Sequence, residues 1–398
     1  MITHKFRLYP NKKIESLLLE KLNICRTAYN FFLGELNKQK VIDKSLIQGV
    51  IPDMKICDDK YKQVHSKSLQ YEVYKLFSNL SGLSASKKKG RKVGSLRFKG
   101  KGVFKTFTYN QTGYKIDWCD KRNQLLWLSK IGTIPIRCHR KVIGIIKQIT
   151  IKRFQSGKWY AFVIEDGYKQ TKPVNDKVIG IDLGCDNIIF DSDNNSIKNP
   201  RILKKKEKKL KHFQRLMSKK QKGSNNRNRF RVNLSRVYES LTNSRNDFTH
   251  KISRYYANNY GVVAFEDMNI SNLNKGNRLA KSLYDAVIGK IRQYTTYKVE
   301  STGGQVVLVD SRGTTQRCSQ CGTIVKKELR DREHNCTFCG FVATRDYNSA
   351  LEIKRLCLQK IGQGLSESIK HLEMGALLSN EQLLSMKNEA TSSTSGVS

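Results

Sequence analysis

The sequence is poor in proline, in tryptophan and in acidic residues. Its 398 residues include 5 Pro and 3 Trp, and 34 Asp and Glu stand against 74 Lys and Arg, so the formal net charge is +40. A positive surplus of this size repels itself and is typical of proteins that bind a polyanion such as nucleic acid. The balance argues against an ordinary small-metabolite enzyme, and a hydrophobic content of 38% argues against a wholly disordered chain.

Long apolar runs are also absent. No stretch of 18 consecutive apolar residues occurs, so we expect no transmembrane helix and no membrane partner. The N-terminal segment MITHKFRLYPNKK carries charges where a signal peptide needs an apolar core. The sequence therefore predicts a cytoplasmic protein.

The ten cysteines do not form a disulfide framework, because six are scattered and the others form two close pairs. The paired residues are Cys318, Cys321, Cys336 and Cys339. Gly322 and Gly340 follow the two pairs and permit tight turns. Four thiolates around one ion are the ligand set of a structural zinc site, so we predict bound Zn²⁺. His334 lies between the pairs, and we expect it on the surface rather than as a ligand.

The first half of the chain changes its pattern twice. Residues 1–10 read as a strand, 11–85 as helices, and 87–102 as a Gly- and Lys-rich loop. Short β segments with turn residues between them follow over 103–165, which favours a small barrel or sheet. Lys172–Asn175 marks a boundary.

The second half alternates buried strands with helices. Strands are predicted at 178–184 and 188–190 with a hairpin between them, and at 262–266 and 305–310. One long helix is indicated by an apolar stripe of Leu234, Val237, Leu241, Phe248, Ile252 and Tyr255. Another helix carries Leu283, Val287, Ile291 and Tyr294, and a last one begins near Asp346. Residues 366–398 are Ser-rich and weakly patterned, which predicts a flexible tail.

Three acids occupy positions where a solvated surface charge is hard to explain. Asp182 interrupts the apolar strand VIGIDLG, and Glu266 ends VVAFE. Asp346 shares one helix face with Ala350 and Ile353. The order strand, strand, helix fits an RNase H-like sheet, in which carboxylates hold paired divalent ions for phosphodiester hydrolysis. We therefore predict that these three acids are catalytic and bind two Mg²⁺.

Alternatives to this triad remain open in the sequence. Asp346 could instead be the N-cap of its helix. Asp186, Asp267 and Asp310 are nearby competitors, of which Asp310 is the most credible substitute because it follows the strand QVVLV.

Several motifs together resemble the TnpB family. In order along the chain they are DLG at 182–184, VVAFEDMNI at 262–270, the CSQCG…CTFCG ribbon at 318–340 and DYNSA at 346–350. The segments KFRLYP, RFKGK and KWYAFVIED are similar to that family as well. Members are insertion-sequence-encoded, RNA-guided DNA endonucleases related to compact type V CRISPR effectors. The resemblance covers about residues 1–360.

The resemblance implies a multidomain α+β and α/β protein of the prokaryotic, nucleoid-associated cytoplasm. The implied parts are a β-barrel wedge (1–10 and 87–173), an inserted helical recognition domain (11–86), a RuvC-like nuclease (174–312 and 343–365) and an inserted zinc ribbon (313–342). It also implies a guide RNA from the transposon end and a double-stranded DNA target beside a short motif. Asp182, Glu266 and Asp346 match the family's catalytic acids. The oligomeric state is not predicted.

Two basic segments are candidate nucleic-acid contacts. Residues 201–236 hold 15 Lys and Arg against one acid, and 87–101 mixes cations with Phe98. The residues predicted to bind are Lys204, Lys205, Lys206, Lys208, Lys209, Lys219, Lys220, Arg227, Arg229, Lys88 and Arg91. A solvated helical face and a flexible basic linker are the alternatives for these segments.

Three other functions are compatible with parts of this pattern. A guide-RNA-directed DNA-binding regulator would bind without cleavage, although the chain retains all three acids. An RNase H-fold transposase usually ends its triad with Glu, whereas this chain has Asp346. A plain RNA-binding protein would show no metal dependence.

Overall fold

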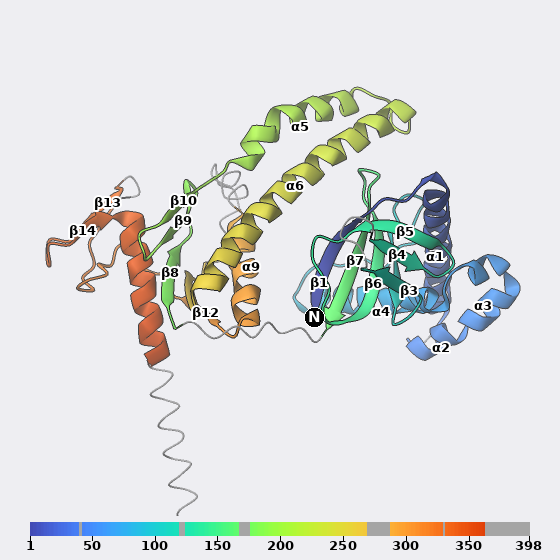
Figure 1. Ribbon diagram of the computed structural model, residues 1–398, viewed down its shortest axis with the longest axis horizontal. Helices are drawn as coiled ribbons and strands as arrows, with labels where there is room; N and C mark the ends of the chain where they lie inside the picture. The colour runs from blue at the N-terminus through green and yellow to red at the C-terminus, as the bar shows by residue number, and fades with distance from the viewer. Residues whose placement is uncertain (40–41, 119–123, 167–175, 269–286, 329–330, 363–398) are drawn as a thin grey trace, which may run out of the picture. The chain divides into compact units, whose positions relative to one another are not determined.

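The computed structural model describes residues 1–39, 42–118, 124–166, 176–268, 287–328 and 331–362 (Figure 1). These residues divide into two compact units, one built from Met1–Tyr168 with Leu210–Glu239 and the other from Lys169–Lys209 with Ser240–Ser398. The predicted boundary at Lys172–Asn175, the tail 366–398 and Leu283 lie outside the described residues.

The first unit contains a seven-stranded sheet in the order β2-β6-β7-β1-β5-β4-β3. Its strands are β1 (Ile2–Leu8), β2 (Thr106–Asn110), β3 (Tyr114–Asp117), β4 (Leu125–Leu128), β5 (Gly132–Arg137), β6 (Ile145–Arg153) and β7 (Trp159–Asp166). The N-terminal strand lies in the middle because β1 pairs with β7 along its whole length and with β5 on its other side. The predicted run of short strands is confirmed.

Helices fill the interval between β1 and β2. They are α1 (Lys12–Lys38), α2 (Lys44–Gly49), α3 (Ile51–Cys57), the 3-10 helix η1 (Asp59–Gln63) and α4 (Ser66–Lys88). Asn11 caps α1 by accepting a hydrogen bond from the Ile14 N–H. The apolar faces of α1 and α4 share one core with the sheet, which includes Phe32, Leu69 and Trp159.

A tyrosine links each edge strand of this sheet to a segment near the opposite edge. Among the described residues β2 and β3 form no ladder with each other. The Tyr109 hydroxyl donates to the Ser129 carbonyl at 2.7 Å, and the Tyr114 hydroxyl donates to the Ile146 carbonyl at 2.8 Å. The sheet therefore approaches the predicted barrel, because Tyr109 of β2 reaches the end of β4 and Tyr114 of β3 reaches β6.

The second unit contains a five-stranded sheet in the order β10-β9-β8-β11-β12. Its strands are β8 (Val178–Asp182), β9 (Asn187–Asp191), β10 (Ser196–Lys198), β11 (Val262–Glu266) and β12 (Gln305–Val309). The first three form an antiparallel meander, and β11 and β12 run parallel to β8. The predicted strands and hairpin are confirmed.

The remaining elements are helical except for one small hairpin. Helices α5 (Ile202–Ser218) and α6 (Asn225–Asn259) follow β10, and α9 (Ile288–Ser301) precedes β12. A two-stranded hairpin, β13 (Glu333–Asn335) and β14 (Val342–Thr344), leads into the C-terminal helix at 345–362. Within the described part of the chain, no helix combines the length and apolar character needed to cross a membrane.

The stripe predicted for α6 is right except at its end. Leu234, Val237, Leu241 and Ile252 are buried, but Tyr255 is 48% exposed, so the prediction for Tyr255 is wrong. Tyr256 is buried in its place. It lies four residues after Ile252, and at this point of α6 that spacing, rather than three residues, keeps a side chain on the inner face. The Tyr256 hydroxyl donates to Asp191 at 3.0 Å.

Candidate active site and metal centres

Two of the predicted acids lie side by side at the carboxyl ends of neighbouring parallel strands. Phe265 of β11 pairs with Ile181 of β8, so the next residues, Glu266 and Asp182, are cross-strand neighbours. Side chains alternate between the faces of a strand, so both acids lie on the face opposite Phe265 and Ile181. Their strands thus end in two adjacent carboxylates.

The residues that precede the two acids on this face of the sheet are small, so a helix can pack close to the strands. Gly180 and Ala264 stand two positions before Asp182 and Glu266, and they pair with each other across the strands. A Cβ added at Gly180 would lie 2.2 Å from the Ala350 carbonyl oxygen, so the backbone of the C-terminal helix rests directly on this glycine. The larger residues of the two strands, such as Phe265, point to the other face and pack against α6 and α9.

The contact at Gly180 places Asp346 next to the other two acids. Ala350, Ile353 and Cys357 are fully buried, and the last two pack on the acid-bearing face of the sheet. Asp346 lies one turn before Ala350 on the same stripe. The structure therefore brings together the three acids, which are separated in sequence by 84 and 80 residues.

The alternative role of Asp346 as an N-cap is not the one that the structure shows. The helix begins at residue 345, and the Tyr347 N–H donates to the Thr344 Oγ1 at 3.3 Å. Thr344 occupies the capping position, three residues before the amide that it accepts. Asp346 is half-buried inside the first turn, and its Oδ1 lies 3.6 Å from the Arg345 Nε.

The electrostatics of Asp182 show that the carboxylates interact. The pKa of Asp182 is raised to about 8, mainly by burial and then by the charges of Glu266 and Asp346. Arg345 and the Leu183 N–H oppose this shift. Like charges held this close disfavour the ionised form, so Asp182 is affected by both of the other acids.

Glu266 is buried and held by a neighbour that the sequence did not indicate. The Thr314 hydroxyl donates to the Glu266 Oε1, and both side chains are less than 10% exposed. Burial raises the pKa of Glu266, and the Thr314 hydrogen bond lowers it. Arg292 contacts the backbone carbonyl of Glu266 at 3.4 Å. Thr314 therefore orients one oxygen of the Glu266 carboxylate.

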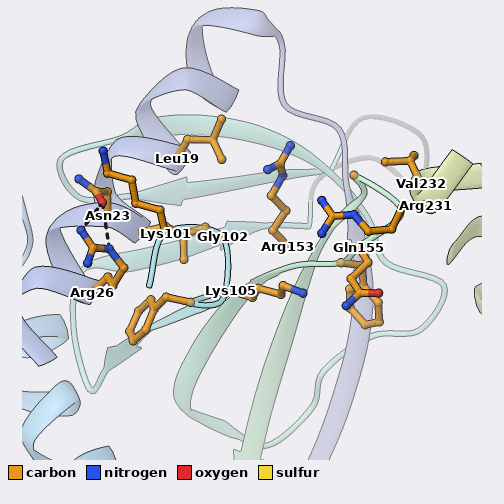
Figure 2. Close-up of a pocket in the computed structure, with 14 residues that line it drawn as sticks. Leu19, Asn23, Arg26, Lys101, Gly102, Lys105, Arg153, Gln155, Arg231 and Val232 are labelled. Atoms are coloured by element: carbon orange, nitrogen blue, oxygen red, sulfur yellow. Dashed lines mark hydrogen bonds between the residues drawn. The ribbon is translucent and has the colours of Figure 1, made fainter. Parts of the chain in front are cut away.

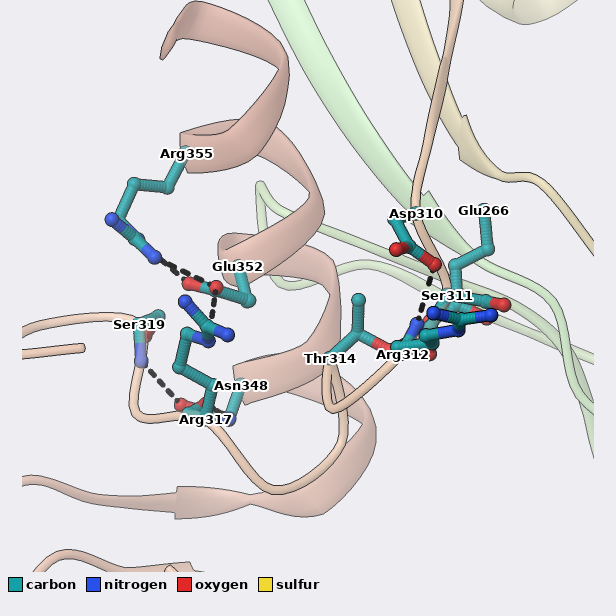
Figure 3. A network of polar contacts seen from close by, with 10 residues as sticks. All are labelled: Glu266, Asp310, Ser311, Arg312, Thr314, Arg317, Ser319, Asn348, Glu352 and Arg355. Carbon is teal, nitrogen blue, oxygen red and sulfur yellow. Dashed lines mark hydrogen bonds and ion pairs between the residues drawn. The ribbon is translucent and has the colours of Figure 1, made fainter. Parts of the chain in front are cut away.

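The competing acids do not join this cluster. Asp310 is exposed, and its Oδ1 accepts a hydrogen bond from the Arg312 N–H at 3.0 Å (Figure 3). Asp267 and Asp186 have side chains that are 66% and 74% exposed, with arginine partners. None of them is among the charges that shift the pKa of Asp182.

The four paired cysteines form a second centre. Their sulfur atoms all lie within 4.8 Å of one another, at Cys318, Cys321, Cys336 and Cys339. The Cys318–Cys339 and Cys321–Cys336 sulfur separations are 3.7 and 3.6 Å. A tetrahedron with Zn–S bonds of about 2.3 Å has S–S edges of roughly 3.8 Å, so the set fits zinc. The structural spacing thus agrees with the zinc prediction.

The two cysteine pairs sit in matching turns. The Gly322 N–H donates to the Cys318 carbonyl and the Gly340 N–H to the Cys336 carbonyl, at 2.9 and 2.8 Å. Gly322 and Gly340 have φ of 79° and 70°, in the left-handed region that favours glycine. The prediction for His334 is wrong in one respect, because this side chain is buried rather than on the surface; it packs near Phe341 instead of joining the ligands.

A polar network ties the base of the cysteine module to the C-terminal helix (Figure 3). Asn348 accepts a hydrogen bond from the Ser319 N–H at 3.0 Å and donates to the Arg317 carbonyl at 2.8 Å. Glu352, which is fully buried, receives two hydrogen bonds from Arg355 at 2.7 and 2.8 Å and lies 3.6 Å from Arg317. The module is therefore fixed to the helix that carries Asp346.

Asp191 is one of several buried acids that the sequence did not indicate. Asp191 ends the apolar strand β9 much as Glu266 ends β11, and it is fully buried. Its oxygens accept from the Asn195 and Asp193 amides and from the Tyr256 hydroxyl. Asp191 pairs with Ile181 and so lies on the face opposite Asp182. Its role is to close the β9–β10 turn and hold α6.

Most of the predicted nucleic-acid contacts are exposed. The exposed members are Lys204, Lys205, Lys208, Lys209, Lys219, Lys220, Arg229, Lys88 and Arg91. Lys206 instead donates to the Ser240 and Ser244 hydroxyls, and Arg227 donates to the Met217 and Lys220 carbonyls at the end of α5. These two side chains brace the α5–α6 hairpin. The predicted contacts with nucleic acid stay predictions.

Comparisons with known families match three parts of the chain. Residues 161–277 match a family model described as "Probable transposase" (OrfB_IS605). Residues 289–353 match the "Cas12f1-like, TNB domain" model, and residues 1–39 match the helix-turn-helix domain model of the OrfB_IS605 type.

Two solved structures share the fold. A Cas12f1–sgRNA–target DNA complex has a TM-score of 0.53 at 16% identity, covering 86% of this chain and 83% of that one. The mini-RNA-guided endonuclease CRISPR-Cas_phi3 has a TM-score of 0.54 at 9% identity, covering 89% and 92%.

The curated relatives carry consistent names. InsQ of Escherichia coli (strain K12), named for RNA-guided DNA endonuclease activity, is 30% identical over 275 residues, which are 65% of this chain and 67% of InsQ. A Streptomyces pristinaespiralis protein with the same designation is 32% identical over 52% of this chain, and the match spans about half (51%) of that protein. The TnpB-like protein L770 of Acanthamoeba polyphaga mimivirus is 22% identical over 90% of this chain and 73% of its own length. With its two acid-bearing parallel strands, its C-terminal acid helix and its four-cysteine module, the chain belongs to the TnpB family of RNA-guided DNA endonucleases.

Proposed function

We propose that this protein is an RNA-guided DNA endonuclease of an insertion sequence that hydrolyses target DNA beside a short motif. The observation that carries the proposal is the meeting of Asp182, Glu266 and Asp346 at one edge of the second sheet, where the pKa of Asp182 responds to the other two. Such a cluster of hard oxygen ligands has no evident use in folding, because it opposes its own ionisation.

The donor set suits magnesium. Three carboxylates supply the oxygen ligands that hard divalent cations prefer, and the mutual repulsion of their charges is what such cations relieve. Asp182, Glu266 and Asp346 would hold two Mg²⁺, and the chemistry that these supply when bound is activation of the attacking water and stabilisation of the leaving 3′ oxygen.

The protein's own groups prepare this site in three ways. Thr314 holds one oxygen of Glu266 in place. Arg345 lies beside Asp346 and offsets part of the negative charge. Gly180 lets the C-terminal helix approach the sheet closely enough for Asp346 to face Asp182. Because Asp182 has a pKa of about 8, it must release a proton at neutral pH when a cation binds.

The cysteine module is proposed to be a zinc ribbon with a structural role. It spans few residues and has little core of its own, so bound metal would supply much of its folding free energy, about 10–16 kcal/mol in comparable small modules. Its network with Asn348 and Glu352 transmits that rigidity to the acid-bearing helix.

The partners proposed are a guide RNA from the transposon end and double-stranded target DNA. Guide pairing would read the target sequence, and the protein would follow the phosphate backbone with its basic surface. For the domains we propose the wedge at 1–10 and 87–173, the recognition helices at 11–86, the RuvC-like nuclease at 174–312 and 343–365, and the ribbon at 313–342.

The test begins with the RNA that copurifies with the protein. Sequencing it should reveal a constant part and a variable 3′ segment, and a plasmid carrying the match to that segment beside randomised flanking bases should be cut in Mg²⁺. Cutting of a subset of flanks would identify the adjacent motif. Binding of the plasmid without cutting would support the regulator instead, and joining of DNA ends would support the transposase.

A further inference from the structure

The first unit contains a hollow of about 460 Å³ (Figure 2). Segments far apart in the sequence line it: α1, the loop at 101–105, the turn between β6 and β7, and residues 231–232 of α6. Its volume lies within the range of about 300–1,000 Å³ typical of sites that enclose a small ligand.

The lining is strongly basic. It includes Arg26, Lys101, Lys105, Arg153 and Arg231, and none of its fourteen residues, all within the described chain, is an aspartate or glutamate. Figure 2 shows these side chains arriving from opposite walls. A hollow with five cations and no carboxylate favours an anion.

The cations are crowded as well as numerous. The pKa of Lys105 is lowered by burial first, and then by the charges of Arg231, Lys152 and Arg153. Arg153 has an acid partner in the protein, because the Glu15 Oε1 lies 3.8 Å from its Nη2. Bringing the other positive groups together opposes folding, and a negative ligand would offset this cost. The arrangement is therefore hard to explain as a simple solvated surface.

One cation is fixed in place by the protein itself. The Arg26 Nε and Nη2 donate to the Asn23 Oδ1 at 3.1 and 3.0 Å, and its Nη1 donates to the Lys99 carbonyl at 3.1 Å. Asn30 in turn accepts from the Lys99 N–H at 2.7 Å, which pins the basic loop to α1. The guanidinium thus needs little reorganisation to meet a ligand.

The hollow also has apolar lining residues. Leu19 is 38% exposed, and Phe154 and Val232 are half-buried. Figure 2 shows Leu19 and Val232 on opposite sides of Arg153. Apolar side chains interleaved with cations match the two halves of a nucleotide, whose base has a flat apolar face and whose phosphate is anionic.

We propose that this hollow binds the phosphates of an unpaired stretch of nucleic acid, with a base against one of the apolar side chains that line it. A single strand fits because its base can turn into a concavity of this size, whereas a paired base in a duplex is held in the stack. The inference relies on the proposed function only for the presence of nucleic acid, and it needs no DNA cleavage.

The salt dependence of binding tests the proposal. Short fluorescein-labelled single-stranded RNA, the same sequence as DNA, and the corresponding duplex are titrated with protein freed of copurifying RNA, in Mg²⁺-free buffer. Each lost phosphate contact lowers the salt slope by about 0.7 for single strands, so Lys105→Gln/Arg231→Gln should lower it by about 1.4 and weaken binding about 25-fold near 0.1 M salt. Lys101→Gln, at an exposed loop position, should weaken binding about fivefold on the same basis.

A double variant with the same loss of charge is the control. Lys115→Gln/Lys141→Gln removes two exposed lysines of the same unit that do not line the hollow, and it should change single-strand binding by less than about threefold. A larger loss with RNA or with DNA identifies which strand uses the hollow, and either supports the proposal. Equal losses in the two double variants, or a loss confined to the duplex, would overturn it. Because this experiment does not measure DNA cleavage, it can refute nucleic-acid binding in the hollow without affecting the nuclease assignment. Likewise, loss of the nuclease assignment would not refute binding in the hollow.

Discussion

Replacing Gly180 by alanine tests whether the close approach of helix and sheet builds the proposed active site. The added Cβ would lie 2.2 Å from the Ala350 carbonyl oxygen and 2.6 Å from the Lys354 amide nitrogen, and both atoms belong to helix backbone. Neither can turn aside as a flexible side chain could, so the helix must shift. Overpacking of this kind typically costs about 1–3 kcal/mol of unfolding free energy.

The shift should reach catalysis through Asp346, which the same helix carries. A displacement of about 1 Å in a catalytic group can lower the rate roughly 100-fold. We therefore expect Gly180→Ala to cut a guide-matched plasmid about 100-fold more slowly, with guide RNA binding unchanged and a lower melting temperature.

Gly82→Ala is the matched control. Gly82 lies in α4, and a Cβ there would meet nothing within 4 Å. Alanine should be neutral or stabilise that helix by up to about 1 kcal/mol. Cleavage by Gly180→Ala within twofold of the wild type, with an unchanged melting temperature, would refute the proposed role of the helix contact.

Three further predictions concern the acids and the zinc module. Folding raises the pKa of Asp182 from 3.8 to about 8, so this carboxyl binds a proton more tightly in the folded than in the unfolded chain. The stability that Asp182 contributes to the folded state therefore falls as the pH rises from about 4 to about 8. In Mg²⁺-free buffer Asp182→Asn should therefore gain about 2–3 kcal/mol over the wild type between pH 5 and pH 7, seen in denaturant midpoints; parallel pH profiles would contradict this. Thr314→Val should slow cleavage about 10- to 100-fold and move the pH profile upward because Glu266 loses its donor, while Thr314→Ser should restore both; a profile unmoved by valine would assign Thr314 a purely structural role. Cys336→Ser should abolish bound zinc and expose the module to proteolysis, and retention of stoichiometric zinc would contradict the four-cysteine site.

Local patterns were sufficient to single out the three acids and the four cysteines that the structure brings together. Asp182 and Glu266 interrupt or end runs of apolar residues, and period-two alternation assigns them to one face together with Gly180 and Ala264. Asp346 is followed at helical spacing by the buried residues Ala350 and Ile353, which predicts that all three lie on one face of the helix. Each of these signals is contained within a few residues of chain.

Contacts between distant segments could not be predicted in the same way. Thr314 meets Glu266 across 48 residues, and nothing in its surroundings distinguishes it from other threonines. The capping role of Thr344 competes with that of Asp346 until the helix start is known. Tyr255 and Tyr256 are adjacent in sequence, and only packing decides which of them is buried. His334 is a polar residue that is buried because it packs near Phe341. Such features depend on tertiary packing.

The central claim is that Asp182, Glu266 and Asp346 form one hydrolytic site. Guide-programmed plasmid cleavage in Mg²⁺ should be lost in each of Asp182→Asn, Glu266→Gln and Asp346→Asn, with guide RNA binding retained. Asp310→Asn should cut at the wild-type rate, because Asp310 ends the neighbouring segment but is exposed and bonded to the Arg312 amide. Full cleavage by any of the first three variants, or loss of cleavage in Asp310→Asn alone, would contradict the account.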